Sequence, residues 1–361
     1  MSENPLMELA AERQVRLASE FQKAAAELTG EKLATAYQGA VASAPRRAEA
    51  GKAFFEPHPA RRRTKAKERD AEDLAAALVG HCRNVGKGFW MPKILPDEPD
   101  HTLEFLDHRV PMKGKREDKG TSHLDMVGLL DDRLAVVKFK YVDPGATRGS
   151  TGDTPLRFLL EGLSDAAAAA ASADAMREEL AKRFEREVSD ATPALILIAT
   201  RRYWELARKR SVQKGAHWIS QLERLSAEVE EAAGIVVEFL GVELNGPSSE
   251  PAWDIEKDEK GEEAPVLREA PRLTLAWEAT AGRVKPKSKP KPKSENTVEI
   301  IEADPSRPPR PYKITESYEP GDMIQHSTLG NGVVQCPGGP GKIQVIFDGV
   351  RKVLVHERPA S

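Results

Sequence analysis

Asp125, Lys138 and Lys140 are ionisable residues that lie within two apolar runs, HLDMVGLL and RLAVVKFK. A carboxylate can bind a divalent cation, and an ammonium group can stabilise a phosphate or position an attacking water molecule. Burying either group costs several kcal/mol unless the group is paired or holds a ligand. These three residues are therefore the first candidates for a functional site.

The two runs have the length and the Val/Leu content of neighbouring β-strands, and Asp131 to Arg133 form a short polar turn between them. Side chains alternate between the faces of a strand, so Lys138 and Lys140 share one face of the second strand. We expect a β-hairpin that brings Asp125 towards both lysines. The alternative is that these residues have no catalytic or binding role: Asp125 simply pairs with a lysine, or the three side chains line a solvated face of the sheet.

A strand aspartate followed, after a turn, by a second strand that ends in acid-x-Lys resembles the PD-(D/E)xK nuclease superfamily. The resemblance implies that Asp125 is the first metal-binding acid and that Lys140 assists the attacking water. It also implies a Mg²⁺ cofactor and hydrolysis of phosphodiester bonds. The position of the second acid holds Lys138, whose ammonium group would repel the cation. Either another carboxylate, with Glu72 and Glu161 as candidates, replaces that acid, or the site does not cut.

Helix and strand patterns continue on both sides of the hairpin. Residues 70–82 and 155–188 have helical spacing, and TLEFLDHRV, PALILIAT and IVVEFLGVEL are typical of strands. Glu72 lies in the first turn of its predicted helix, where the helix dipole alone favours an acid. The order predicts an α+β fold with a mixed β-sheet flanked by helices, similar to the restriction-endonuclease-like core, over residues 66–245.

A basic and aromatic segment follows the run PALILIAT. Its candidate nucleic-acid-binding residues are Arg201, Arg202, Tyr203, Trp204 and Arg208. Basic side chains bind phosphates, and aromatic rings stack on bases. The alternative is a helix with its rings in the core and its charges in solvent. A second basic cluster, at residues 61–67, is a candidate for phosphate contact or a solvated loop.

The composition limits the classes of function. The chain has 361 residues, of which 40% are hydrophobic and 31% charged, enough for two or three soluble domains. No apolar run approaches the roughly 20 residues of a membrane-spanning helix, and the start lacks a signal-peptide pattern, so we expect a cytoplasmic protein. Two distant cysteines argue against a disulfide framework. With a net charge of −3, any nucleic acid must be bound by local basic patches.

The C-terminal segment contains four short strand-like runs joined by LGNG, PGGPG and DGV turns. It resembles the SH3-like, Tudor-like domains of UvrD-type helicases and CarD-type transcription regulators. The resemblance implies a small all-β SH3-like barrel that binds protein, commonly RNA polymerase. Gln325, Gln335 and Gln344 are the candidates for an exposed strand face that receives this partner.

The predicted organisation has five parts. These are an N-terminal helical region (1–65), the nuclease-like core (66–245), an irregular acidic segment (246–282), a Pro/Lys-rich linker (283–317) and the barrel (318–361).

The first functional hypothesis is a DNA-associated adaptor, with a degenerate core that binds nucleic acid and a barrel that docks on transcription or repair machinery. The ammonium group of Lys138 favours it, because this group can occupy the place of a cation beside Asp125. The alternative is an active nuclease that binds Mg²⁺ through Asp125 and a second acid, Glu72 or Glu161.

Overall fold

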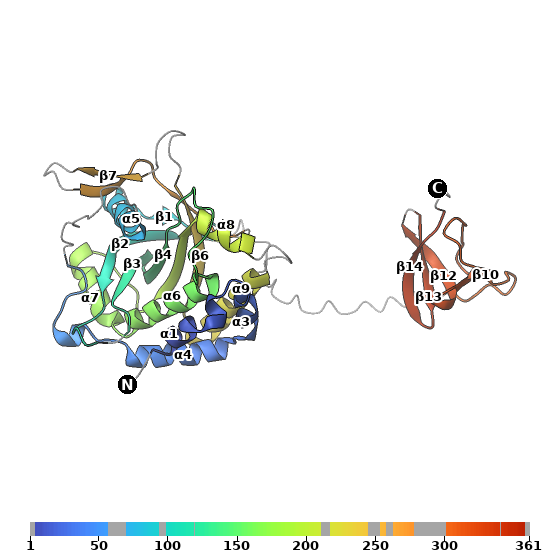
Figure 1. Ribbon diagram of the computed structural model, residues 1–361, viewed down its shortest axis with the longest axis horizontal. Coiled ribbons are helices and arrows are strands. Elements are labelled where there is room, and N and C mark those ends of the chain that lie inside the picture. Colours follow the sequence, from blue (N-terminus) through green and yellow to red (C-terminus); the bar gives the residue numbers. More distant parts are fainter. Residues whose placement is uncertain are drawn as a thin grey trace. The chain divides into compact units, whose positions relative to one another are not determined.

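The computed structural model describes residues 4–56, 70–93, 99–118, 120–210, 217–244, 253–257, 263–277, 301–339 and 341–357. The chain divides into two compact units, Met1–Val284 and Lys285–Ser361, called unit 1 and unit 2. Unit 1 contains a seven-stranded mixed sheet with helices on both faces, and unit 2 contains a five-stranded sheet (Figure 1). The predicted α+β class, with a mixed sheet flanked by helices, is confirmed.

The large sheet has the strand order β1-β2-β3-β4-β5-β6-β9. Its strands are β1 (Phe89–Trp90), β2 (Thr102–Pro111), β3 (His123–Leu130), β4 (Arg133–Lys140), β5 (Ala194–Thr200), β6 (Val237–Glu243) and β9 (Arg272–Leu275). β1 to β4 pair antiparallel, β5 and β6 run parallel to β4, and β9 is antiparallel to β6. A parallel pair needs a crossover, which α6 (Pro155–Ala170) and α7 (Ala173–Phe184) provide between β4 and β5.

The predicted hairpin is formed by β3 and β4. Leu130 pairs with Arg133, so the turn consists of Asp131 and Asp132. The acidic segment that follows residue 245 also contributes to the fold. β7 (Trp253–Lys257) and β8 (Glu263–Leu267) pair with each other, and β9 joins the large sheet beside β6. The sheet of unit 1 therefore extends past the predicted end of the core.

Different helices cover the two faces of the sheet (Figure 1). α5 (Ala71–Val85) packs on the face that carries Met126 and Val137. α6 packs on the opposite face, where its alanines meet Val136. Val136 and Val137 are neighbours on β4, so their side chains point to opposite faces. Thr154 precedes α6 and caps it, because its side chain accepts a hydrogen bond from the Arg157 N–H.

The N-terminal helices belong to the core of unit 1. They are α1 (Pro5–Ala11), α2 (Arg13–Arg16), α3 (Phe21–Glu27) and α4 (Gly30–Ser43), followed by the short helix η1 (Ala48–Ala50). The buried side chains of α1 to α4 pack with α6 and α9 (His217–Ala233) in one apolar cluster. Arg224 on α9 donates hydrogen bonds of 2.9 Å to the carbonyl oxygens of Ala25 and Leu28. The predicted N-terminal helical region is therefore an integral part of unit 1.

Unit 2 contains β10 (Arg310–Pro311), β11 (Met323–His326), β12 (Gly330–Gly339), β13 (Lys342–Phe347) and β14 (Val350–Val355), paired in this order. Tyr318, Ile324, Val334, Ile343, Val345 and Phe347 form its buried core.

Gln335 is buried in unit 2, at 3% exposure, which contradicts its expected place on an exposed face. Its side-chain amide forms two hydrogen bonds of 2.9 Å with the backbone of Ile301, one as acceptor and one as donor. Gln325 is exposed and Gln344 half-buried. Within the described residues of both units, no helix combines the length and the apolar character that crossing a bilayer demands.

Candidate functional site

The β3–β4 hairpin brings Asp125 and Lys138 together. Met126 on β3 pairs with Val137 on β4. The strands are antiparallel, so Asp125, which precedes Met126, lies opposite Lys138, which follows Val137, on the same face of the sheet. The Nζ atom of Lys138 lies 3.3 Å from Oδ2 of Asp125. The Phe139 N–H donates a 3.0 Å hydrogen bond to the same carboxylate. The expected approach of this aspartate to the first lysine is confirmed.

A second carboxylate, that of Asp165, reaches the same ammonium group from α6. Its Oδ2 atom lies 2.9 Å from Nζ of Lys138, and its Oδ1 accepts a 3.1 Å hydrogen bond from the Thr121 hydroxyl. The Asp165 side chain is only 8% exposed. Sequence reasoning missed this residue, although Glu161 precedes it by four positions and therefore lies on the same face of the helix.

Lys140 also pairs with two carboxylates. Its Nζ atom lies 3.3 Å from Asp153 and 3.3 Å from Glu161. Arg157, one turn earlier on α6, forms a 2.7 Å ion pair with Glu161. Of the two acids predicted as replacements, Glu161 therefore does reach the hairpin, although its carboxylate is held by a lysine and an arginine.

The hairpin–α6 cluster consists of these seven charged residues: Asp125, Lys138, Lys140, Asp153, Arg157, Glu161 and Asp165. Each ammonium group is held between two carboxylates, so both lysine charges are compensated within the cluster. Across the described residues, no group of three or more acidic, His or Cys side chains has an arrangement suited to a metal ion. The ammonium of Lys138 occupies the space between two carboxylates that a cation would need.

Burial and charge shift two pKa values in this cluster. Burial by itself lowers the pKa of Lys138, but the carboxylates of Asp165 and Asp125 outweigh burial and raise it. Burial raises the pKa of Asp165 to about 6, the charge of Asp125 adds to this effect, and Lys138 and Thr121 oppose it. The Asp165 carboxyl group, with a pKa of about 6, therefore changes its charge just below neutral pH.

Replacing Asp165 with asparagine is expected to change how the stability of unit 1 depends on pH. Folding raises this pKa from 3.8, so the folded protein binds more protons than the unfolded chain up to about pH 6. The stabilising contribution of the protonated group is complete below pH 3.8 and is lost as the pH rises through about 6. The unfolding free energy of the wild type relative to Asp165→Asn should fall by roughly 2–3 kcal/mol between these limits. Urea titrations followed by tryptophan fluorescence measure this difference, and a constant difference would contradict the assignment.

Glu72 lies on the far side of the sheet from Asp125, which corrects the expected metal pair. It belongs to α5, on the face that α6 does not cover, and its carboxylate forms a 3.1 Å ion pair with Arg109 on β2. The two acids are separated because the Asp125 side chain lies on the face of the sheet that α6 covers, whereas α5 packs on the other face.

The aromatic residues of the basic segment are in the core. Tyr203 and Trp204 lie on α8 (Arg201–Arg210), and both are buried against Phe158. Neither ring is therefore exposed for stacking on a base, as the alternative interpretation of this segment predicted. Trp204 also donates a hydrogen bond from its indole N–H to the carbonyl oxygen of Leu240.

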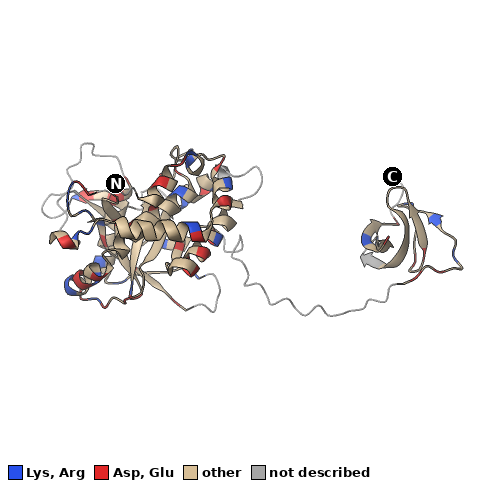
Figure 2. Ribbon diagram, turned by 90° about the horizontal axis from the view of Figure 1, so that it is seen from below, with Lys and Arg blue, Asp and Glu red and all other residues tan. Residues whose placement is uncertain are grey.

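The arginines of α8 have protein partners. Arg201 pairs with Glu205 at 3.1 Å and with Glu243 at 3.2 Å. Arg202 pairs with Glu205 at 3.0 Å and donates to the carbonyl oxygen of Ala146. Arg208 is exposed. Basic and acidic residues are intermingled on the helices of unit 1 in the view of Figure 2.

Two other basic stretches, residues 61–67 and the lysines of the linker up to residue 293, lie outside the described residues.

Comparison of the chain with protein-family models, curated proteins and solved structures gives no match.

Proposed function

We propose that this protein is a DNA-associated adaptor whose nuclease-like core does not hydrolyse phosphodiester bonds. One observation carries the proposal: Lys138 is bound between Asp125 and Asp165, at 3.3 Å and 2.9 Å. Mg²⁺ would need carboxylate oxygens at roughly 2.0–2.1 Å and would have to displace an ammonium group held by two opposite charges. The lysine thus neutralises the acids that a catalytic metal would otherwise use.

The order of elements supports a nuclease-like origin for this core. α5 precedes three antiparallel strands, and α6 and α7 connect them to the parallel strand β5. This order is similar to that of the PD-(D/E)xK core. Asp125 lies on the second of the three strands, and Lys138 and Lys140 lie on the third.

The adaptor role also requires attachment to DNA and to a protein partner. The lysines between residues 285 and 293 carry a run of positive charge, which favours nonspecific contact with phosphates. Unit 2, taken as an SH3-like module, would dock on transcription or repair machinery, with RNA polymerase as the first partner to test. Its edge strand β14 exposes Val350, Val353 and Val355, an apolar edge suited to a protein surface.

A cleavage and metal-binding assay tests the proposal. The full-length wild type, Asp125→Ala and Lys140→Ala are each incubated with labelled single- and double-stranded DNA in the presence of Mg²⁺ or Mn²⁺. We expect that none of the three proteins cuts the DNA. We also expect that the wild type binds DNA, which a gel mobility shift would detect. Lys138→Glu should gain Mn²⁺ binding by calorimetry, because it replaces the competing cation with a ligand. Metal-dependent cutting that Asp125→Ala abolishes would instead establish the active nuclease.

A further inference from the structure

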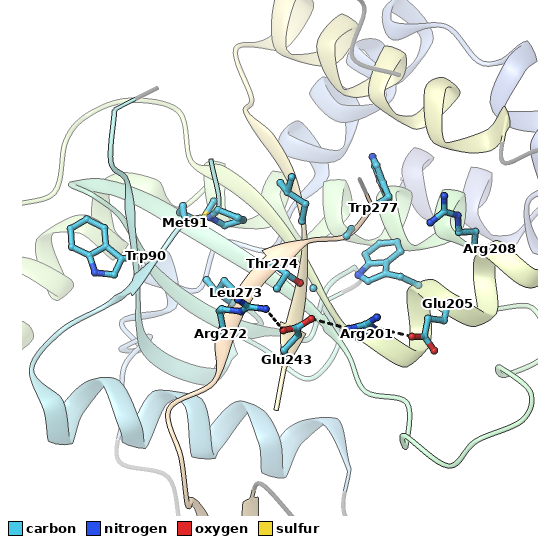
Figure 3. A pocket seen from close by; sticks show the side chains of 15 residues that line it. Trp90, Met91, Arg201, Glu205, Arg208, Glu243, Arg272, Leu273, Thr274 and Trp277 are labelled. Carbon is cyan, nitrogen blue, oxygen red and sulfur yellow. Dashed lines mark hydrogen bonds and ion pairs between the residues drawn. The ribbon is translucent and has the colours of Figure 1, made fainter. Parts of the chain in front are cut away.

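A groove on unit 1, distinct from the hairpin–α6 cluster, lies between β1, α8, β6 and β9 (Figure 3). It encloses about 700 Å³, within the roughly 300–1,000 Å³ of typical ligand sites. Gly241 on β6 contributes no side chain to its floor, and a Cβ there would lie 2.6 Å from Oγ1 of Thr274 on the neighbouring strand. Glycine is therefore required at this position, because the Thr274 side chain occupies the space where a Cβ would lie.

Arginines give this groove a local excess of positive charge. Among the residues that the structure describes, its lining includes three arginines, Arg201, Arg208 and Arg272, and two acids, Glu205 and Glu243. The side chains of Arg201 and Arg272 are 69% and 70% exposed, and both pair with the single carboxylate of Glu243, at 3.2 Å and 2.6 Å. A guanidinium group has five N–H donors, so donors remain on both arginines for an anionic ligand.

An exposed indole, that of Trp90, forms one end of the groove. Trp90 is 67% exposed, and Met91 and Pro92 continue the apolar surface beside it. In Figure 3 it lies at one end, Arg272 and Arg201 lie across the middle, and Arg208 lies at the other end. An aromatic platform next to a row of guanidinium groups suits a chain of unpaired bases joined by phosphates.

We propose that this groove binds single-stranded nucleic acid, with a base stacked on Trp90 and phosphates bound by Arg272 and Arg201. The proposal rests on the nucleic-acid association of the proposed function and assigns it to a surface. Duplex DNA keeps its bases stacked on each other, so the indole can meet a base face only in an unpaired strand. The carboxylates of an extended acidic peptide could pair with the arginines, but such a peptide has no planar ring to stack on the exposed indole of Trp90.

The test uses the full chain and a fluorescent ten-nucleotide oligothymidylate, measured by anisotropy, with a duplex of the same length for comparison. Trp90→Ala should weaken binding of the single strand by roughly 5- to 150-fold, and Trp90→Phe should restore most of it. Arg272→Ala should reduce the slope of log affinity against log salt by about 0.7. Arg186→Ala, which removes the same charge from outside the groove, is the matched control and should leave binding unchanged.

The possible outcomes separate this proposal from the proposed function. If Trp90→Ala and Arg272→Ala bind the oligonucleotide as tightly as the wild type, the groove is not the binding site. The proposed association with DNA would then stand, through another surface. No binding of any oligonucleotide by the wild type would overturn both. Binding of a poly-glutamate peptide that these variants weaken, with unchanged oligonucleotide affinity, would assign the groove to acidic protein segments instead.

Discussion

Replacing Lys138 with methionine is expected to lower the unfolding free energy of unit 1 by about 3–5 kcal/mol. The substitution keeps the length of the side chain but removes the ammonium group between Asp125 and Asp165, which are 3.3 Å and 2.9 Å from it. Two largely buried carboxylates would then repel each other without a cation. Chemical denaturation followed by fluorescence measures the loss for unit 1, because all five tryptophans lie in that unit.

Two further variants make this prediction specific. Lys182→Met removes an exposed lysine from α7 and should change stability by less than about 0.5 kcal/mol. Adding Asp125→Asn and Asp165→Asn to Lys138→Met should recover most of the lost stability, because no uncompensated charge remains. A stability for Lys138→Met equal to that of the Lys182 control would show that the ion pairs do not determine the stability of this site.

Replacing Phe21 with alanine is expected to lower the unfolding free energy of unit 1 by about 3–5 kcal/mol. Phe21 on α3 is 1% exposed, and its ring centroid lies 6.0 Å from that of Trp218 on α9. Removing the ring leaves a cavity between the N-terminal helices and the rest of unit 1. The expected result is a single fluorescence transition at a lower denaturant concentration, with the same dependence on denaturant.

Met7→Ala on α1 is the matched control for Phe21, since Met7 is 41% exposed and should tolerate truncation within about 0.5 kcal/mol. If Phe21→Ala instead left the main transition unchanged, the N-terminal helices would unfold independently of the sheet. This measurement tests whether the N-terminal helices unfold together with the sheet, whereas the sequence alone predicted a separate helical region at residues 1–65.

The β3–β4 hairpin was predictable because its determinants are local. Two short apolar runs rich in Val and Leu indicate the strands, a polar pair forms the turn, and the strand period then places Asp125 and Lys138 on one face. The proximity of Asp165 was not predictable in this way, since it depends on where α6 docks. Periodicity shows that a helix has an apolar side, but it does not show which face of a sheet that side covers.

The same distinction explains the outcome for Glu72 and for α8. An acid in the first turn of α5 is compatible with packing on either face, and only the assembled sheet separates it from Asp125. In α8, basic and aromatic residues are consistent with an exposed binding surface or with a buried ring pair. Tyr203 and Trp204 are buried because Phe158 and Trp277 complete an aromatic cluster from distant parts of the chain.

The position of Lys138 has an evolutionary consequence. Lysine and glutamate codons differ only in their first base, so one nucleotide change would replace this ammonium group with a third carboxylate beside Asp125 and Asp165. Such a mutant would fold well only when a divalent ion supplied the missing positive charge. A single nucleotide change could therefore create a metal-binding site here, and folding would then depend on the supply of metal in the cell.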